Sequence, residues 1–205
     1  EQLEDKDWER EWMDNFHPIQ FGEKLWICPS WRDIPDPDAV NVLLDPGLAF
    51  GTGTHQTTAL CLSFLDKTEV CNKVLCDYGT GSGILAIAAL KLGAKQLYAV
   101  DIDPQAVTAT LQNAKSNSVS MDKLKVGLVE EITIPMVDIM LANILATPLI
   151  SLASTLVGKV KPGGTLVLSG LLEEQIEAVS NAYFPLVTKI ESVLKDEWAM
   201  LVIQR

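Results

Sequence analysis

The chain has 205 residues, enough for one large domain with a substantial core, and 48% of them are hydrophobic, which excludes a disordered chain. No apolar run approaches the roughly 20 residues of a membrane span and no basic, apolar leader is present, so we expect a cytoplasmic protein without a membrane partner. A formal net charge of −11 disfavours recognition of nucleic acid and suits a basic partner, although acidity also serves solubility alone.

The N-terminal segment predicts a small helix and strand extension. Trp8, Trp12 and Phe16 recur at helical spacing, which is typical of a helix that docks on its own domain. Two short apolar runs, 25–28 and 40–44, predict strands, and the three prolines between them predict a loop.

The division of the chain follows from this pattern. We expect residues 1–45 to form a linker helix and cover segment, and residues 46–205 to form the main domain. Because the chain begins with Glu1 rather than Met, we interpret it as a fragment of a longer protein.

Residues 44–58 read L-D-P-G-L-A-F-G-T-G-T-H-Q-T-T and precede an apolar run at 59–65 that predicts a helix. Glycines around the aromatic Phe50 indicate a loop that closes over a ligand. The hydroxyls of Thr57 and Thr58 stand where the helix begins. They either hold a ligand carboxylate or simply cap the helix.

A second glycine-rich stretch, D-Y-G-T-G-S-G over 77–83, follows a short apolar run and precedes another. This order predicts a strand over 74–78, a tight turn, and a helix over 83–92 whose first N–H groups and positive dipole end suit an anion. Glycine permits positive φ and close approach of a ligand to the backbone.

The spacing of these glycines discriminates between ligand classes. A dinucleotide fingerprint requires a glycine at position 84, where this chain has Ile84, so an NAD-dependent oxidoreductase is disfavoured. The D-x-G-x-G-x-G pattern resembles the first motif of Rossmann-like S-adenosylmethionine methyltransferases. Asp101 ends the next predicted strand, where a βαβ unit places an acid on the ribose hydroxyls. The alternative is a structural turn with an ordinary strand-ending acid.

The remaining pattern alternates between strands and helices, which is typical of a parallel sheet with right-handed crossovers. Strands are predicted at 97–101, 124–128, 136–142, 165–169, 187–193 and 198–203, helices at 104–116, 148–157 and 173–182, and a turn at 161–164. We therefore expect an α/β, Rossmann-like methyltransferase fold with a mostly parallel seven-stranded sheet and a C-terminal antiparallel hairpin.

Asn143 ends the fourth predicted strand, at the carboxyl edge where such sheets bind ligands. An asparagine at this position is able to accept a hydrogen bond from an amine. Alternatively, it caps the next helix.

No metal or disulfide framework is expected. The cysteines lack C-x-x-C spacing, and Cys61 and Cys76 lie in apolar runs typical of a core. His17 and His55 are too isolated to form a metal pair.

Most of the chain resembles the catalytic domain of the ribosomal protein L11 methyltransferase (PrmA) family. The matching stretches are 8–16, 44–58, 77–89, 101–104 and 143–146, and the run over 44–58 together with N-I-L-A over 143–146 is far more specific than the glycine turn. The resemblance implies S-adenosylmethionine as cofactor, and methylation of lysine side chains and a terminal amine on a basic ribosomal protein of the large subunit.

The resemblance also implies site residues. Thr58, Gly79, Asp101 and Asn143 would contact the cofactor. We assign Asp101 to the ribose, Thr58 and the amides of 79–83, including Gly81, to the methionyl end, Asn143 to the orientation of the amine, and Phe50 to the lid. The family carries an N-terminal substrate-recognition domain, which we expect this chain to lack.

Other readings of the fold predict other substrates. Methyltransferases of nucleic acid or glutamine usually spell the fourth-strand motif N-P-P-Y, whereas this chain has Ile144 and Leu145 in place of the prolines. An N-methyltransferase acting on another protein, RNA or a small molecule remains the alternative, as does a cofactor-binding scaffold without activity.

Overall fold

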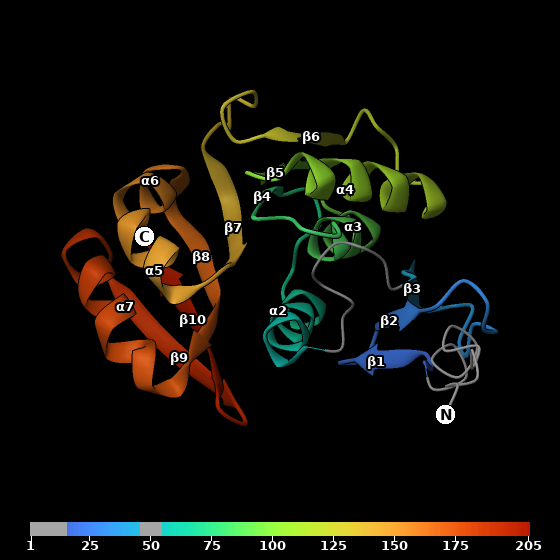
Figure 1. The fold of residues 1–205 in the computed structure, drawn as a ribbon, viewed down its shortest axis with the longest axis horizontal. Coiled ribbons are helices and arrows are strands. Elements are labelled where there is room, and N and C mark those ends of the chain that lie inside the picture. The colour runs from blue at the N-terminus through green and yellow to red at the C-terminus, as the bar shows by residue number, and fades with distance from the viewer. Residues whose placement is uncertain (1–15, 46–54) are drawn as a thin grey trace, which may run out of the picture.

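The structure, a computed structural model, describes residues 16–45 and 55–205. Its main sheet has the strand order β6-β5-β4-β7-β8-β10-β9 (Figure 1). The strands are β4 (Val74–Tyr78), β5 (Gln96–Asp101), β6 (Leu124–Leu128), β7 (Val137–Asn143), β8 (Val160–Leu172), β9 (Lys189–Lys195) and β10 (Trp198–Gln204). Strands β6, β5, β4, β7 and β8 are parallel, and β10 pairs antiparallel with both β8 and β9. The expected sheet and its C-terminal hairpin are confirmed.

Helices cover both faces of this sheet, as Figure 1 shows. One face carries α2 (Gln56–Lys67), α3 (Ile84–Lys91) and α4 (Pro104–Ser116), and the other carries α5 (Ala146–Ser151), α6 (Ala153–Gly158) and α7 (Ile176–Tyr183). Short 3₁₀ turns at Glu173–Gln175 and Phe184–Leu186 flank α7. Helix α4 begins as its sequence dictates, because the Asp103 side chain accepts from the Gln105 N–H and Pro104 fills the first turn.

The continuous apolar run of β7 supplies both layers of the core. Ile139 and Leu141 pack in the layer under α2 and α3, whereas Met140 and Ala142 pack in the layer under α5 to α7. Successive side chains of a strand point to opposite faces, so the middle of a strand covered on both sides, here Ile139 to Ala142, is apolar at successive positions.

Several element boundaries differ from the expectations. The predicted turn at 161–164 belongs to a longer β8, because Gly163 N donates to Arg205 O at 2.8 Å and Arg205 N donates to Gly164 O at 3.1 Å. The single helix expected at 148–157 is two helices, interrupted at Leu152. The segment expected as a helix at 173–182 begins with the 3₁₀ turn.

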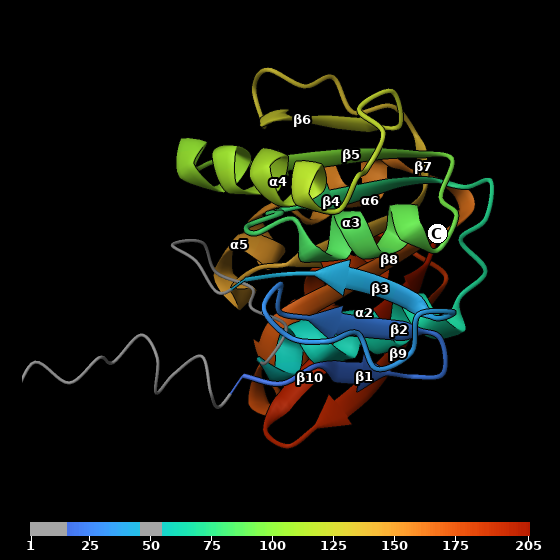
Figure 2. The ribbon, with the colours of Figure 1, turned by 90° about the vertical axis from the view of Figure 1, so that its right-hand side faces the viewer.

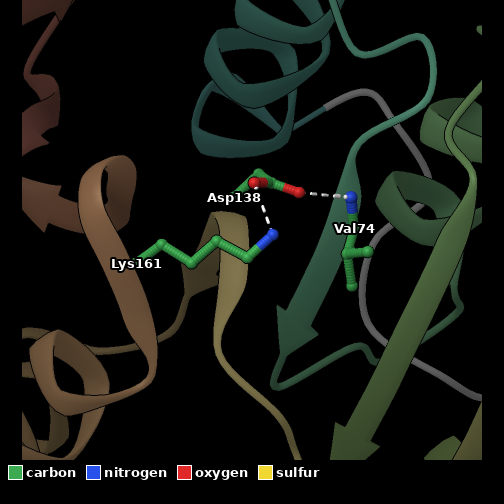
Figure 3. A network of polar contacts seen from close by, with 3 residues as sticks. All are labelled: Val74, Asp138 and Lys161. Atoms are coloured by element: carbon green, nitrogen blue, oxygen red, sulfur yellow. Dashed lines mark hydrogen bonds and ion pairs between the residues drawn. The ribbon is translucent and has the colours of Figure 1, made fainter.

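Asp138 ties the amino ends of three central strands together (Figure 3). Its carboxylate accepts the Val74 N–H of β4 at 2.8 Å and the Lys161 ammonium of β8 at 2.7 Å. Burial opposes ionisation, but the Lys161 and Val74 hydrogen bonds together with lysine charges hold the Asp138 pKa below its usual value. The register of β7 against β8 shifts between Val137 and Ile139, which turns Asp138 toward its partners. Registry of the central strands is therefore specified at the edge opposite their carboxyl ends.

A second, three-stranded sheet lies in front of α2 and α3 in Figure 2. It comprises β1 (Ile19–Phe21), which the sequence pattern did not reveal, β2 (Leu25–Cys28) and β3 (Val40–Leu43). Its apolar side chains share the core layer under α2 and α3. Of the aromatic stripe, Trp8 and Trp12 lie outside the described residues, while Phe16 packs against Trp31 with ring centroids 6.4 Å apart. The boundary at residue 45 stays a prediction.

The Asp66 side chain of α2 anchors the small sheet. Its carboxylate accepts the N–H groups of Glu23, Lys24 and Leu25 at 2.8, 2.8 and 3.0 Å. The turn needs glycine at position 22, where φ is +73° and an added Cβ would lie 1.9 Å from Asp66 Oδ2. A second anchor is Asn117, whose side-chain oxygen accepts from Leu43 N and whose amide donates to Leu43 O, each at 2.7 Å.

We expect Asp66→Ala to lower the free energy of unfolding by about 3 kcal/mol, because three backbone donors lose a charged acceptor. Asp66→Asn should lower the free energy of unfolding by less, because its side-chain oxygen can still accept from the N–H groups of Lys24 and Leu25. Urea unfolding measures both, with the exposed Asp33→Ala as control. An Asp66→Ala variant as stable as that control would contradict the anchoring role.

Candidate functional site

A cavity of about 850 Å³ opens at the carboxyl ends of β4, β5, β7 and β8, within the roughly 300–1,000 Å³ range of small-molecule sites. Its lining is mostly apolar. It includes all five residues that the sequence predicted as cofactor-binding, namely Thr58, Gly79, Gly81, Asp101 and Asn143. Residues distant in the sequence therefore meet in one place, as expected for the carboxyl edge of an open α/β sheet.

The turn between β4 and α3 is held by its own backbone. The amides of Gly79 and Thr80 both donate to Val100 O, at 2.8 and 3.1 Å, and Gly83 N donates to Thr80 O at 2.8 Å. Gly81 N donates to the Asp101 carboxylate at 2.9 Å. These amides therefore have partners within the chain, which differs from the expectation that they point at a ligand. The glycines instead permit the positive φ values of the turn, which are +80°, +55° and +81° at 79, 81 and 83.

Asp101 presents its carboxylate to the cavity in a fixed orientation. One oxygen accepts the N–H groups of Ile102 and Asp103 at 2.8 and 3.1 Å, and the other accepts only from Gly81 among the described residues. A carboxylate offers about four acceptor positions, so it retains capacity for a ligand hydroxyl. The next side chain, Ile102, is 82% exposed and also lines the cavity. Asp101 and Ile102 therefore place an acceptor for a ligand hydroxyl next to an apolar surface.

Thr58 and Asn143 form the opposite side of the cavity. Asn143 Nδ2 donates to Thr58 Oγ1 at 3.3 Å, and no described residue donates to Asn143 Oδ1. Neither residue caps a helix, because the cap of α2 is His55 and that of α5 is Leu145. The Asn143 amide is therefore oriented by Thr58 with its oxygen available as an acceptor.

The sequence pattern does not identify several of the lining residues. His55 lies edge-on to Trp198 with ring centroids 4.7 Å apart, and both line the cavity. Tyr78, Ile144 and Gly170 complete the wall between β4 and β8. Trp198 carried no signal beyond its place at a strand start, since only the pairing of β10 with β8 brings it to this edge.

Further expectations concern the lid, metal and membrane binding, and the cysteines. Phe50, the expected lid residue, lies outside the described residues. In 16–45 and 55–205 no three potential metal-ligating side chains cluster, and no helix there has the length and apolarity to cross a membrane. Cys61 and Cys76 are buried, as expected for core residues.

Asp77 lies beneath the glycine turn and is 1% exposed, so it supports the site from below. Burial, the largest cause, and the charge of Asp101 raise the pKa of its carboxyl from 3.8 to about 7, although the Thr80 hydroxyl and the Ala86 N–H oppose this shift. Thr80 Oγ1 donates to one oxygen at 2.8 Å, while the other has no hydrogen-bond partner among the described residues. The turn is therefore sensitive to the charge on a buried acid.

A carboxyl with a raised pKa stabilises the fold most below its unfolded value near 3.8, and this contribution is lost as pH rises toward about 7. Asp77→Asn mimics the neutral form. Its free energy of unfolding relative to wild type should therefore increase by about 2–3 kcal/mol between pH 5 and pH 8. Urea unfolding at both pH values checks this, with the exposed Asp122→Asn as control. A difference that does not change with pH would refute it.

Known proteins identify the family. The family model described as "Ribosomal protein L11 methyltransferase (PrmA)" matches residues 1–205. The chain is 60% identical over 202 residues to the ribosomal protein L11 methyltransferase of Shewanella halifaxensis, covering 98% of this chain and 69% of that protein.

Solved structures of methyltransferases share the fold of this chain. A ribosomal protein L11 methylase from Lactobacillus delbrueckii subsp. bulgaricus superimposes with a TM-score of 0.83 at 35% identity, covering 93% of this chain and 99% of that one. A T. thermophilus 16S rRNA methyltransferase, solved with AdoMet and guanosine, gives a TM-score of 0.64 at 18% identity over 77% of this chain and 45% of its own, which shows a shared fold only. The chain belongs to the ribosomal protein L11 methyltransferase (PrmA) family.

Proposed function

We propose that this protein transfers methyl groups from S-adenosylmethionine to amino groups of ribosomal protein L11, namely lysine side chains and the N-terminal amine, in the cytoplasm. The observation that carries the proposal is the meeting of the glycine turn, Asp101 and Asn143 around one cavity in a chain of this family. The acidic chain, with its net charge of −11, is complementary to a basic protein substrate.

The residues present fit S-adenosylmethionine. Asp101 would accept from the ribose hydroxyls, and the exposed Ile102 offers apolar surface beside it for the adenine. Gly79 and Gly81 line the cavity with backbone that carries no side chain, although the amides of these residues donate to Val100 and Asp101. Thr58, at the start of α2, would hold the methionyl end.

Bound S-adenosylmethionine supplies a methyl group activated by a sulfonium leaving group, so the protein must chiefly align a nucleophile and exclude water. Asn143 Oδ1 would accept a hydrogen bond from the amine and direct its lone pair, while the Asn143–Thr58 hydrogen bond fixes the amide. A lysine amine has a pKa of about 10.4 in water and must lose its proton to react. The apolar cavity walls favour the neutral amine by desolvation.

Methylation of purified L11 with labelled S-adenosylmethionine tests the proposal, with ribosomal RNA as the competing substrate. We expect label in L11 and none in RNA. Asn143→Ala should lower kcat about tenfold or more, because a hydrogen bond to the reacting amine is lost, and should reduce turnover more than cofactor affinity. Label in RNA alone would overturn the substrate assignment, and wild-type turnover of Asn143→Ala would remove the role of that residue.

Asp101→Ala should weaken S-adenosylmethionine binding at least tenfold, since a charged acceptor for the ribose is lost. Isothermal calorimetry measures the dissociation constant directly, without L11. Asp122→Ala makes the same change of charge just before β6, at the opposite edge of the sheet, and should bind like wild type. Equal affinities for the two variants would defeat the ribose assignment.

A further inference from the structure

Ile144 lies between two glycines that come from the strands on either side of its own. Strand β7 ends at Asn143 and runs between β4 and β8. A Cβ added to Gly79, just after β4, would lie 2.3 Å from Ile144 Cγ2. A Cβ added to Gly170 in β8 would lie 2.3 Å from Ile144 O and 2.8 Å from its carbonyl carbon. No side chain larger than hydrogen fits on either side of Ile144 as it now lies.

Backbone conformation reinforces this requirement. Gly79 and Gly170 have φ of +80° and +88°, values that favour glycine. Gly163, also in β8, has a similar φ of +77°, but an added Cβ there would have nothing within 4 Å. A comparison of Gly163 and Gly170, both in β8, therefore separates the strain of positive φ from the steric contact with Ile144.

The contact bears on the proposed amine-orienting group because Asn143 immediately precedes Ile144. Asn143 pairs with Ser169 across the sheet, and Ser169 Oγ donates to Thr57 O at 3.1 Å. Asn143 in turn donates to Thr58. These contacts form a ring that links β7, β8 and α2. Because Asn143 belongs to this ring and is bonded to Ile144, displacement of Ile144 would move the Asn143 amide.

We propose that Gly79 and Gly170 are positioning residues that hold Ile144, and through it aim Asn143 into the cavity. For catalysis this inference rests on the proposed function. The two glycines act on different atoms of Ile144. Gly79 leaves room for the side chain, whereas Gly170 leaves room for the backbone carbonyl.

The first test compares Gly170→Ala with the matched control Gly163→Ala. We expect Gly170→Ala to lower kcat for L11 methylation by about 100-fold, as a displacement of about 1 Å in a reacting geometry can do. The S-adenosylmethionine dissociation constant should change less than about threefold, since Asp101 lies on a separate strand. Gly163→Ala should keep wild-type turnover. Hydrogen exchange of the unliganded protein should show faster exchange over residues 141–149 in Gly170→Ala only.

The second test uses the difference between side-chain and backbone contact. Gly79→Ala should lose turnover, and Ile144→Ala should restore it to within about threefold of the Ile144→Ala single variant, because the atom in the way is removed and Ile144 Cβ lies 3.8 Å from the added methyl. The same Ile144→Ala change should not rescue Gly170→Ala, where the obstructing atoms are backbone.

The outcomes separate the two proposals. A wild-type protein that leaves L11 unlabelled overturns the proposed function, while exchange over 141–149 still reports on the positioning. If L11 is labelled but Gly170→Ala and Gly163→Ala match in turnover and exchange, the positioning role is wrong. Rescue of Gly170→Ala by Ile144→Ala would equally overturn it, because the contact would then run through the side chain.

Discussion

The hydrogen bond from Gly81 N–H to the Asp101 carboxylate joins the two strand ends on which the rest of the site depends. It fixes the glycine turn against the next strand and holds the acid facing the cavity. Two further amides of the turn donate to Val100 O, so the turn is shaped by its neighbour strand before any ligand arrives. A site organised in this way loses little conformational entropy when it binds a ligand, which favours affinity.

This preorganisation costs folding free energy at Asp77, which lies beneath the turn. Asp77 completes the glycine motif but is buried, with one oxygen lacking a partner among the described residues. Burial raises its pKa to about 7, so the carboxylate is held at the expense of folding free energy. The acid on the next strand, Asp101, has three backbone donors instead. Two acids at neighbouring strand ends therefore serve different purposes, one for the shape of the turn and one for the cavity.

Much of the fold was predictable because local signals agreed with the global arrangement. The apolar run of β7 and the cap of α4 by Asp103 and Pro104 are visible in the sequence. The boundaries of β8 were not, because they depend on pairing with Arg205 at the far end of the chain. The same holds for the site. Thr58, Gly79, Gly81, Asp101 and Asn143 lie in recognisable motifs, whereas Gly170 and Trp198 join them only through strand order.

The bidentate contact of Asn117 with Leu43 has a consequence for association. Strand β3 is an outer strand of the small sheet, and an exposed outer strand is a template for pairing with another chain. By bonding both the N–H and the C=O of Leu43, the Asn117 amide imitates a neighbouring peptide group and occupies that template. The Asn117 side chain, which follows the last residue of α4, thus blocks strand pairing at Leu43 while it fastens the sheet to the domain.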